Sequence, residues 1–276
     1  MRRLIVNADD FVLAENVNLG IVKGHREGIV TSTSLLAGGA AAGHAAGLAK
    51  QNPALGVGVH LCLTLEAPVA NPKKIPSLVK TGRLPCGPFD FMLRYATGSI
   101  KRAEIEAELR AQIERAVSLG IKPTHLDGHQ HIFMMRGIFP IVLKLAGEFK
   151  IRAVRFPFGP WKRGMSLPRA AEKFILERLA GLQRKRLEAS GVRHADNFFG
   201  LPETGMLSAD ALLRIIRYLP DGTSEIMCHP GLPDNALAKK INWGYGWELE
   251  LDAVTDERVR KLVKERSIEL INFGQL

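Results

Sequence analysis

The sequence is poor in cysteine and has no long apolar run. Its three cysteines, Cys62, Cys86 and Cys228, are far apart and form no C-x-x-C pair, which argues against a disulfide framework and a thiolate zinc site. No segment approaches the roughly 20 apolar residues that a membrane-spanning helix needs. The first residues also lack the apolar stretch of a secretory signal. We therefore expect a cytoplasmic protein with reduced cysteines.

The charge of the chain limits its possible partners less strictly than the cysteine content limits its metal sites and disulfides. Lys and Arg number 38 against 28 Asp and Glu, and part of the excess lies in residues 161–193, which hold nine Lys or Arg and three Glu. This segment is either a solvated helix face or a peripheral contact to an anionic membrane. No zinc finger, RNP-like strand or aromatic-basic mixture indicates nucleic acid. Nothing in the sequence defines an oligomeric state.

Strand and helix patterns alternate along the chain. Runs rich in Val, Ile and Thr predict strands at 4–6, 29–36, 55–63, 124–132, 153–158, 224–228 and 268–273, with helices between them. This alternation predicts an α/β fold with a parallel sheet. About seven mostly parallel strands over 276 residues favour an irregular (β/α) barrel. We expect one domain, 1–276, in which the Pro- and Gly-rich residues 66–100 form a lid-like excursion.

Residues that can bind a metal or move protons gather at the predicted strand ends. In a barrel these ends meet at one mouth, where active sites lie. Each residue alone has a structural interpretation, such as a turn, a helix cap or a buried histidine. The set comprises Asp9 and Asp10 after the first strand, His60 in the third, His125, Asp127, His129 and His131 in the fourth, and His229 after strand 224–228. Together they indicate a site.

Spacing limits which of these residues can share one ion. On a regular strand His125 and His129 would lie about 13 Å apart, too far for two metal–nitrogen bonds of ~2.0–2.1 Å. A turn at Gly128 would put His129 at the mouth and His125 deeper. We favour His129 as the ligand, with His125 behind it or as an alternative ligand. One carboxylate and two imidazoles would leave positions open for water and substrate; Zn²⁺ fits this set, and Mg²⁺, Mn²⁺ and Co²⁺ are further candidates.

Four segments resemble the motifs of the YdjC-like carbohydrate deacetylases, which include chito-oligosaccharide deacetylases. They are residues 7–11, 58–61, 124–131 and 225–230, and the resemblance covers nearly the whole chain. It implies a barrel akin to polysaccharide deacetylases and one divalent metal held by Asp10, His60 and His129. It also implies Asp9 as the general base and His229 as the acid.

The first motif departs from this family at one position. Val12 stands where the family usually has glycine. Because positive φ is nearly forbidden to valine, we expect a different first loop. The run 26–34 and the C-terminal third also resemble a subgroup associated with hopanoid biosynthesis. That resemblance implies a lipid-linked N-acetylglucosamine, and the basic segment 161–193 would then suit a membrane surface.

The predicted function is hydrolysis of an N-acetyl group on a sugar or glycolipid. A metal would polarise the carbonyl and activate water, while Asp127 or His131 would support a ligand histidine from behind. Sugar stacking or plain packing explains a set of aromatic residues, Trp161, Trp243, Tyr245 and Trp247. Two alternatives stay open. A metal-dependent phosphoesterase would want more carboxylates and often a second ion ~3.5–4 Å away, and a non-catalytic protein would bind sugar or lipid on the same fold.

Overall fold

The structure is a computed structural model that describes residues 1–160, 165–241 and 243–276. In these ranges eight strands form one sheet, in the order β5-β4-β3-β2-β1-β7-β6 with β8 paired to β1. All of the pairings between named strands are parallel. The strands are β1 (Arg2–Phe11), β2 (Ser32–Leu35), β3 (Gly56–Leu61), β4 (His125–Gly128), β5 (Ala153–Val154), β6 (Asn197–Phe199), β7 (Gly222–Cys228) and β8 (Glu269–Leu270).

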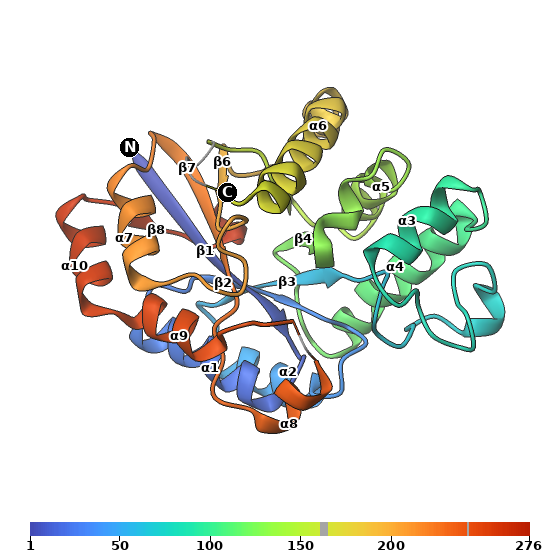
Figure 1. Ribbon diagram of the computed structural model, residues 1–276, viewed down its shortest axis with the longest axis horizontal. Coiled ribbons are helices and arrows are strands. Elements are labelled where there is room, and N and C mark those ends of the chain that lie inside the picture. Colours follow the sequence, from blue (N-terminus) through green and yellow to red (C-terminus); the bar gives the residue numbers. More distant parts are fainter. Residues whose placement is uncertain (161–164, 242) are drawn as a thin grey trace.

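Helices surround the sheet on its outer side (Figure 1). Helices α1 and α2 lie together along one side, α7, α9 and α10 pack beside one another, and α4 covers β3. The α-helices are α1 (Glu15–Glu27), α2 (Ala42–Gln51), α3 (Pro88–Ala96), α4 (Arg102–Ser118), α5 (Phe139–Glu148), α6 (Leu167–Ser190), α7 (Ala209–Arg217), α8 (Asn235–Lys240), α9 (Trp247–Thr255) and α10 (Glu257–Glu265). The short 3₁₀ helices are η1 (Pro72–Lys74), η2 (His129–Met134) and η3 (Phe273–Gln275).

Strand β1 organises the sheet because it pairs with three others. Residues Arg2–Ala8 align with β7, whereas pairing to β2 starts only at Asn7. Strand β8 occupies the free side of the first half of β1. Every residue from Leu4 to Phe11 is buried, as expected for a strand that is covered on both faces.

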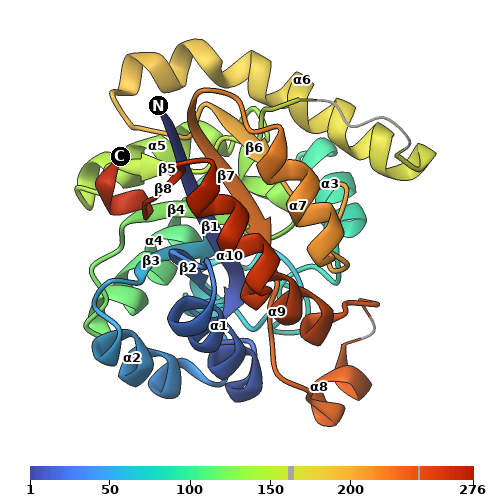
Figure 2. The ribbon, with the colours of Figure 1, turned by 90° about the vertical axis from the view of Figure 1, so that its left-hand side faces the viewer.

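The sheet curls so that its two ends approach each other. The amide of Val154, in β5, donates to the carbonyl oxygen of Arg193 at 2.9 Å. The amide of Phe198, in β6, donates to the carbonyl oxygen of Phe158, also at 2.9 Å. The long helix α6 runs across this part of the molecule (Figure 2). The predicted α/β architecture, an irregular barrel of mostly parallel strands, is therefore confirmed.

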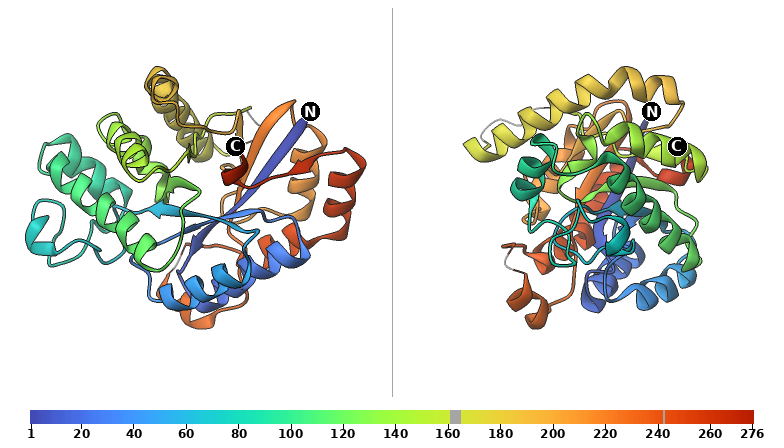
Figure 3. Two further views of the ribbon diagram at one scale, coloured as in Figure 1. Left: turned by 180° about the vertical axis from the view of Figure 1, so that it is seen from behind. Right: turned by 90° about the vertical axis from the view of Figure 1, so that its right-hand side faces the viewer.

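Residues 66–100 form an ordered excursion on α4, on the side opposite α7 and α10 (Figure 3). Two buried glutamates of α4 hold it. The carboxylate of Glu108 accepts the amides of Val69 and Ala70, both at 2.9 Å, and Glu104 Oε2 accepts the amide of Ser77 at 2.6 Å. These bonds satisfy backbone donors that the irregular segment cannot pair within itself. The segment contains η1 and α3.

The largest difference from the predicted elements concerns strand 124–132. Strand β4 ends at Gly128, and the chain continues as η2. A Cβ at Gly128 would lie 2.8 Å from Phe133 and 2.9 Å from the carbonyl oxygen of Leu61, so only glycine allows the chain to fold back here. The predicted turn at Gly128 is confirmed. Strand β6 and helices α3, α8 and α9 were not predicted.

Three further features concern the termini, the membrane and the basic segment. Both chain ends lie at the same end of the molecule (Figures 1 and 3). Among the described helices, none has the length and apolar character to cross a bilayer. Residues 161–164, at the start of the predicted basic segment, lie outside the described residues. The remainder of that segment forms α6 and the turn after it.

Candidate metal centre and catalytic site

The reactive residues lie at the C-terminal ends of parallel strands, as their sequence positions predict. Asp9 and Asp10 belong to the last residues of β1, and His60 is the penultimate residue of β3. His129 directly follows β4, and His229 directly follows β7. All five are at least nine-tenths buried. One mouth of the barrel thus collects residues that lie up to 220 positions apart in the sequence.

Asp10, His60 and His129 form a group that can hold a metal ion. Their ligand atoms all lie within 4.8 Å of one another. Asp10 Oδ1 is 3.6 Å from His60 Nε2 and 3.5 Å from His129 Nδ1. In the described part of the chain neither carboxylate oxygen of Asp10 has a hydrogen-bond partner, although the residue is 1% exposed. A buried carboxylate that accepts no hydrogen bond is costly, so this geometry fits a cation.

Asp127 lies behind His60 and orients it. Asp127 Oδ1 is 2.9 Å from His60 Nδ1, which leaves Nε2 directed at Asp10. Burial lowers the pKa of His60, but the carboxylates of Asp127 and Asp9 outweigh it and raise the pKa to about 9. Asp9, His60 and Asp127 form a second group within 4.8 Å. The carboxylates of Asp9 and Asp127 already pair with Arg155, however, whereas the Asp10 carboxylate has no hydrogen-bond partner among the residues that the structure describes.

Arg155, which was not predicted as a site residue, links three buried carboxylates. Its guanidinium donates to both oxygens of Asp9 at 2.7 Å and to Glu225 Oε1 at 2.7 Å, and it pairs with Asp127 Oδ2 at 3.0 Å. Burial raises the pKa of Asp9, but Arg155 holds it well below its usual range. Burial also raises the pKa of Glu225, to about 7. Asp9 is therefore an ionised and firmly oriented carboxylate.

His229 has a carboxylate partner, Glu250 of α9, which was also not predicted. The His229 amide donates to Glu250 Oε2 at 2.5 Å, and the same oxygen lies 3.8 Å from His229 Nδ1. Burial lowers the pKa of His229, but Glu250 outweighs it and raises the pKa above its usual value. Glu250 Oε1 also accepts the amide of Leu207 at 3.1 Å. Glu250 thus fixes both the position and the charge preference of the histidine.

The structure separates His125 and His131 from the metal group. The His125 ring stacks on Phe273 at 3.9 Å inside the barrel, and a Cβ at Gly58 would lie 2.4 Å from it. Burial lowers the pKa of His125 to about 4 and that of His131 to about 3. His131 lies in the wall of the cavity described below. Neither belongs to a group of ligand atoms within 4.8 Å in the described residues.

The expectation that Val12 excludes a positive φ is wrong. Val12 has φ 90°, and Asp10, two residues before it, has φ 66°. The side chain of Val12 is fully buried, and its amide donates to Asn18 Oδ1 at 2.7 Å. Glycine at position 39 leaves room, because a Cβ there would lie 2.6 Å from Val12 Cγ1. Packing and a buried hydrogen bond thus impose a conformation that valine alone disfavours.

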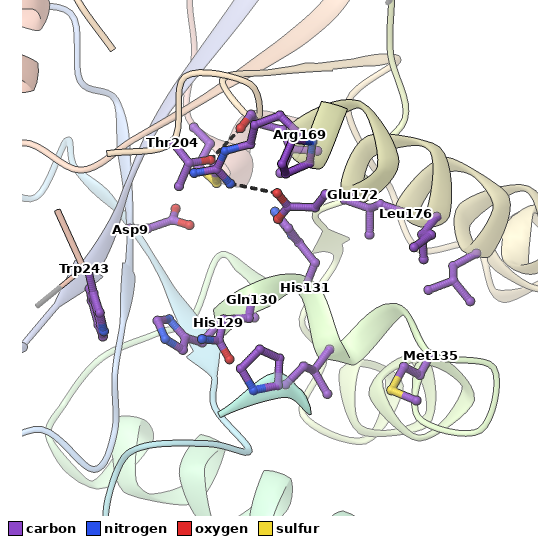
Figure 4. Close-up of a pocket in the computed structure, with 18 of the residues that line it drawn as sticks. Asp9, His129, Gln130, His131, Met135, Arg169, Glu172, Leu176, Thr204 and Trp243 are labelled. Atoms are coloured by element: carbon purple, nitrogen blue, oxygen red, sulfur yellow. Dashed lines mark hydrogen bonds and ion pairs between the residues drawn. The ribbon is translucent and has the colours of Figure 1, made fainter. Parts of the chain in front are cut away.

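A cavity of about 640 Å³ opens beside the metal group. Asp9, His60, His129 and His229 line one part of it. Two aromatic rings complete this part. The ring centroids of Trp243 and His129 are 5.2 Å apart, and those of Tyr245 and His229 are 4.8 Å apart. Figure 4 shows Trp243 facing His129 across this space.

Of the other aromatic residues proposed for sugar stacking, one is buried elsewhere and one lies outside the described residues. Trp247 is 9% exposed and packs on Gly231, and it is not among the residues that line the cavity. Trp161 falls in 161–164. Trp243 and Tyr245 therefore form the aromatic wall of this part of the cavity.

The rest of the cavity wall is largely apolar, although Gln130, Thr204 and the ion pair of Arg169 with Glu172 also line it. Helix α6 contributes one side, and α3 and η2 contribute the other. The apolar side chains and prolines are Pro88, Met92, Ile132, Met135, Pro168, Ala171, Ile175, Leu176, Leu179 and Leu201. Figure 4 shows Leu176 and Met135 at the end away from Asp9 and Trp243. The cavity is thus polar and aromatic at the metal group, and mostly apolar side chains line its far end between α6 and η2.

Comparison with known proteins assigns the family. Residues 3–265 match the family model described as YdjC-like protein. The chain is 37% identical to a carbohydrate deacetylase of Brevibacillus brevis, with 99% of each chain covered. It is 34% identical to a chitooligosaccharide deacetylase of Salmonella schwarzengrund, with 96% of this chain and 95% of that protein covered. The chain belongs to the YdjC-like family, and the resemblance seen in its motifs is confirmed.

A solved structure agrees with this assignment. A candidate cellobiose-phosphate cleavage protein from Enterococcus faecalis has a TM-score of 0.80 and 26% identity to this chain. The match covers 99% of this chain and 98% of that protein. The curled parallel sheet is thus shared over the whole length of both chains.

Proposed function

We propose that this protein is a metal-dependent hydrolase that removes acetyl groups from an N-acetylated amino sugar. The observation that carries the proposal is the buried Asp10 carboxylate, which lacks a hydrogen-bond partner among the described residues and faces His60 and His129 beside a large cavity. The relatives named carbohydrate and chitooligosaccharide deacetylases support the reaction type.

Asp10, His60 and His129 would hold one divalent ion. One carboxylate and two imidazoles suit Zn²⁺, and Mg²⁺, Mn²⁺ and Co²⁺ are alternatives. Bound there, the ion would supply Lewis acidity toward the acetyl carbonyl and the attacking water. Asp127 keeps the Nε2 atom of His60 turned toward Asp10 through its 2.9 Å bond to Nδ1, as carboxylates behind metal-binding histidines commonly do.

Asp9 and His229 would move the protons of the reaction. Asp9 lines the cavity, and Arg155 lowers its pKa and orients its carboxylate; ionised and fixed in this way, Asp9 would act as the base toward the attacking water. His229 also lines the cavity, and the raised pKa of its imidazole favours the protonated form that the leaving amine requires. A base and an acid held at one cleft are what amide hydrolysis needs.

A two-metal phosphoesterase fits this site less well. The second group of possible ligands shares His60 with the first, and both of its carboxylates are paired with Arg155. A second ion would have to displace that buried arginine. The non-catalytic alternative would need no oriented acid and base, yet Asp9 and His229 are each held by a buried charged residue, Arg155 and Glu250.

The apolar wall favours a glycolipid over a free oligosaccharide as the substrate. Sugar rings present hydroxyl groups, which gain nothing from Met135, Ile175 or Leu179. A lipid tail would bury against these side chains at about 25 cal/mol per Å² of apolar area removed from water. With the acetamido group at Asp9 and His229, the attached apolar group would extend along α6.

Exposed apolar side chains of α6 support contact with a membrane that holds such a lipid. On α6 the exposed fractions are 87% for Leu167, 56% for Phe174 and 59% for Ile175. Exposed Lys185 and Arg186 lie further along the same helix. Arg184 packs over the rings of Phe156 and Phe158 instead. Apolar insertion next to basic residues is typical of helices that lie on anionic membranes.

Acetate release tests this proposal. Purified protein with added divalent metal would be assayed on N,N′-diacetylchitobiose and on an N-acetylglucosamine alkyl glycoside. We expect release from both, with higher kcat/KM for the alkyl glycoside. Ile175→Ser should reduce that preference. Leu182→Ser, an exposed change on the same helix outside the cavity lining, should preserve it. If neither substrate releases acetate with any metal, the deacetylase assignment is contradicted. A preference for the disaccharide would instead indicate a free oligosaccharide as the substrate.

Membrane contact needs a separate assay. Sedimentation with anionic vesicles should show binding that weakens with salt, because the Debye length is only ~8 Å at physiological ionic strength. Lys185→Gln with Arg186→Gln should weaken it further, at about 1 kcal/mol per charge near the surface. Equal binding to neutral and anionic vesicles would remove the electrostatic part of the proposal and leave α6 as an apolar contact.

A further inference from the structure

A histidine that the proposed mechanism does not use lies in the wall of the cavity. His131 belongs to η2, two residues after His129, and both line the cavity. Their side chains point in different directions. Figure 4 shows His129 directed toward Trp243, whereas His131 points toward Glu172 of α6 and Thr204. His131 thus faces the cavity away from the metal group.

The imidazole of His131 has polar capacity that the protein does not use. The residue is 9% exposed, and its Nδ1 atom is buried without a hydrogen-bond partner in the described ranges. The imidazole lies beside two aromatic rings, with ring centroids 5.6 Å apart for Phe198 and 6.4 Å apart for Phe133. A buried polar group left unpaired is unfavourable. The ring of His131 lines the cavity, so a ligand with a hydroxyl group would give this imidazole a partner, because one nitrogen of a neutral imidazole donates and the other accepts a hydrogen bond.

The backbone holds His131 in a conformation that most side chains avoid. Gln130 and His131 have φ values of 55° and 53°, and left-handed backbone costs roughly 1–2 kcal/mol per non-glycine residue. The Gln130 side chain anchors the turn, because its Oε1 accepts the hydroxyl of Thr64 at 3.0 Å. Two such residues in succession persist only where the surroundings fix them, and such strain clusters at functional sites.

We propose that His131 binds substrate by a hydrogen bond to a ring hydroxyl group of the sugar that carries the acetamido group. The inference rests on the proposed function, since it places that sugar in the cavity. His131 would then recognise the sugar and select for it, while Asp10, His60 and His129 bind the metal and Asp9 and His229 move protons.

The test replaces His131 with asparagine, a residue that tolerates the left-handed region. On N,N′-diacetylchitobiose, His131→Asn should lower kcat/KM by about 5- to 100-fold, the range for one lost hydrogen bond in a buried site. Metal content should stay at the wild-type value, and the unfolding midpoint should not fall. Lys150→Asn is the matched control, because Lys150 also has positive φ (57°) but is exposed outside the cavity. It should keep full activity.

Substrate analogues show whether the lost contact is to a hydroxyl group. Analogues that lack the hydroxyl at C3, C4 or C6 of the deacetylated residue would be compared on both proteins. We expect one analogue to react poorly with the wild type and to lose no further activity with His131→Asn. Wild-type kcat/KM in His131→Asn, or equal additional losses for all analogues, would overturn the inference. Loss of metal would assign His131 to the metal centre instead. An inactive wild type would overturn the proposed function as well.

Discussion

Metal binding should release about one proton near pH 7, and His60 is the residue that loses it. In the metal-free protein the carboxylates of Asp127 and Asp9 raise the pKa of His60 to about 9. The histidine is therefore protonated at neutral pH, whereas a metal ligand must be neutral. Proton and metal compete for the same imidazole, so the apparent affinity should increase with pH.

The size of this effect follows from the pKa. A pH of 7 is about two units below the pKa of His60. Removing the proton before the metal binds therefore costs about 2.7 kcal/mol of binding free energy, at 1.36 kcal/mol per pH unit. Affinity should thus rise by about tenfold per pH unit from pH 6 to 8 and level off near pH 9. Asp127→Asn removes the carboxylate that contributes most to the raised pKa of His60, so its proton release at pH 8 should be smaller.

Titration calorimetry in buffers of different ionisation enthalpy counts the released protons directly. We expect about one proton per ion at pH 7 for the wild type, by the linkage between metal and proton binding. Glu188→Gln, an exposed change on α6, should give the same number. Asp127→Asn should also bind metal about 10- to 100-fold more weakly, the usual effect of losing such a partner. An affinity that does not change with pH would refute this account of His60.

Three further predictions concern single residues. Asp9→Asn should retain the metal and lose about 10²-fold or more in kcat; turnover near the wild-type rate would remove Asp9 from the mechanism. His125 has a folded pKa of about 4, below its unfolded value of 6.5, so stability is lost as pH falls from 6.5 to 4. Urea unfolding of metal-free His125→Gln should show a pH dependence flatter by up to about 1.4 kcal/mol per unit, and an unchanged slope would contradict it. Val12→Gly should be at least as stable as Val12→Ala, reversing the usual Ala advantage of about 0.5–1 kcal/mol, because φ is 90° there; a clear advantage for alanine would mean that the loop is not strained.

The strand ends could be predicted because the relevant physics is local. Parallel strands bring their C-terminal ends to one edge, so the positions of Asp10, His60 and His229 in the sequence were enough to bring them together. The turn at Gly128 could be predicted from the rise of a strand, because two imidazoles four residues apart on a straight strand cannot reach one ion.

Arg155 could not be found in this way. It follows the two-residue strand β5 and reads as an ordinary basic residue. Its partners Asp9 and Glu225 lie 146 and 70 positions away, and only the curl of the sheet brings the three together. Glu250 escaped prediction for a similar reason, since an acidic residue in the first turn of a helix usually faces solvent.

Val12 shows where a local rule fails. The rule that valine avoids positive φ is correct as a preference, but burial and the bond from its amide to Asn18 outweigh that preference. A contact 27 positions away, at Gly39, makes room for the side chain. Neither term can be read from the motif itself.

The central claim is tested most directly by measuring metal content and acetate release together. Wild-type protein should bind about one divalent ion per chain and release acetate from an N-acetylglucosamine substrate. His60→Ala and His129→Ala should each lose the ion and the activity, while His44→Ala, whose ring contacts Asn18 away from the cavity, should retain both. Full metal content and turnover in either His60→Ala or His129→Ala would contradict the proposed metal centre.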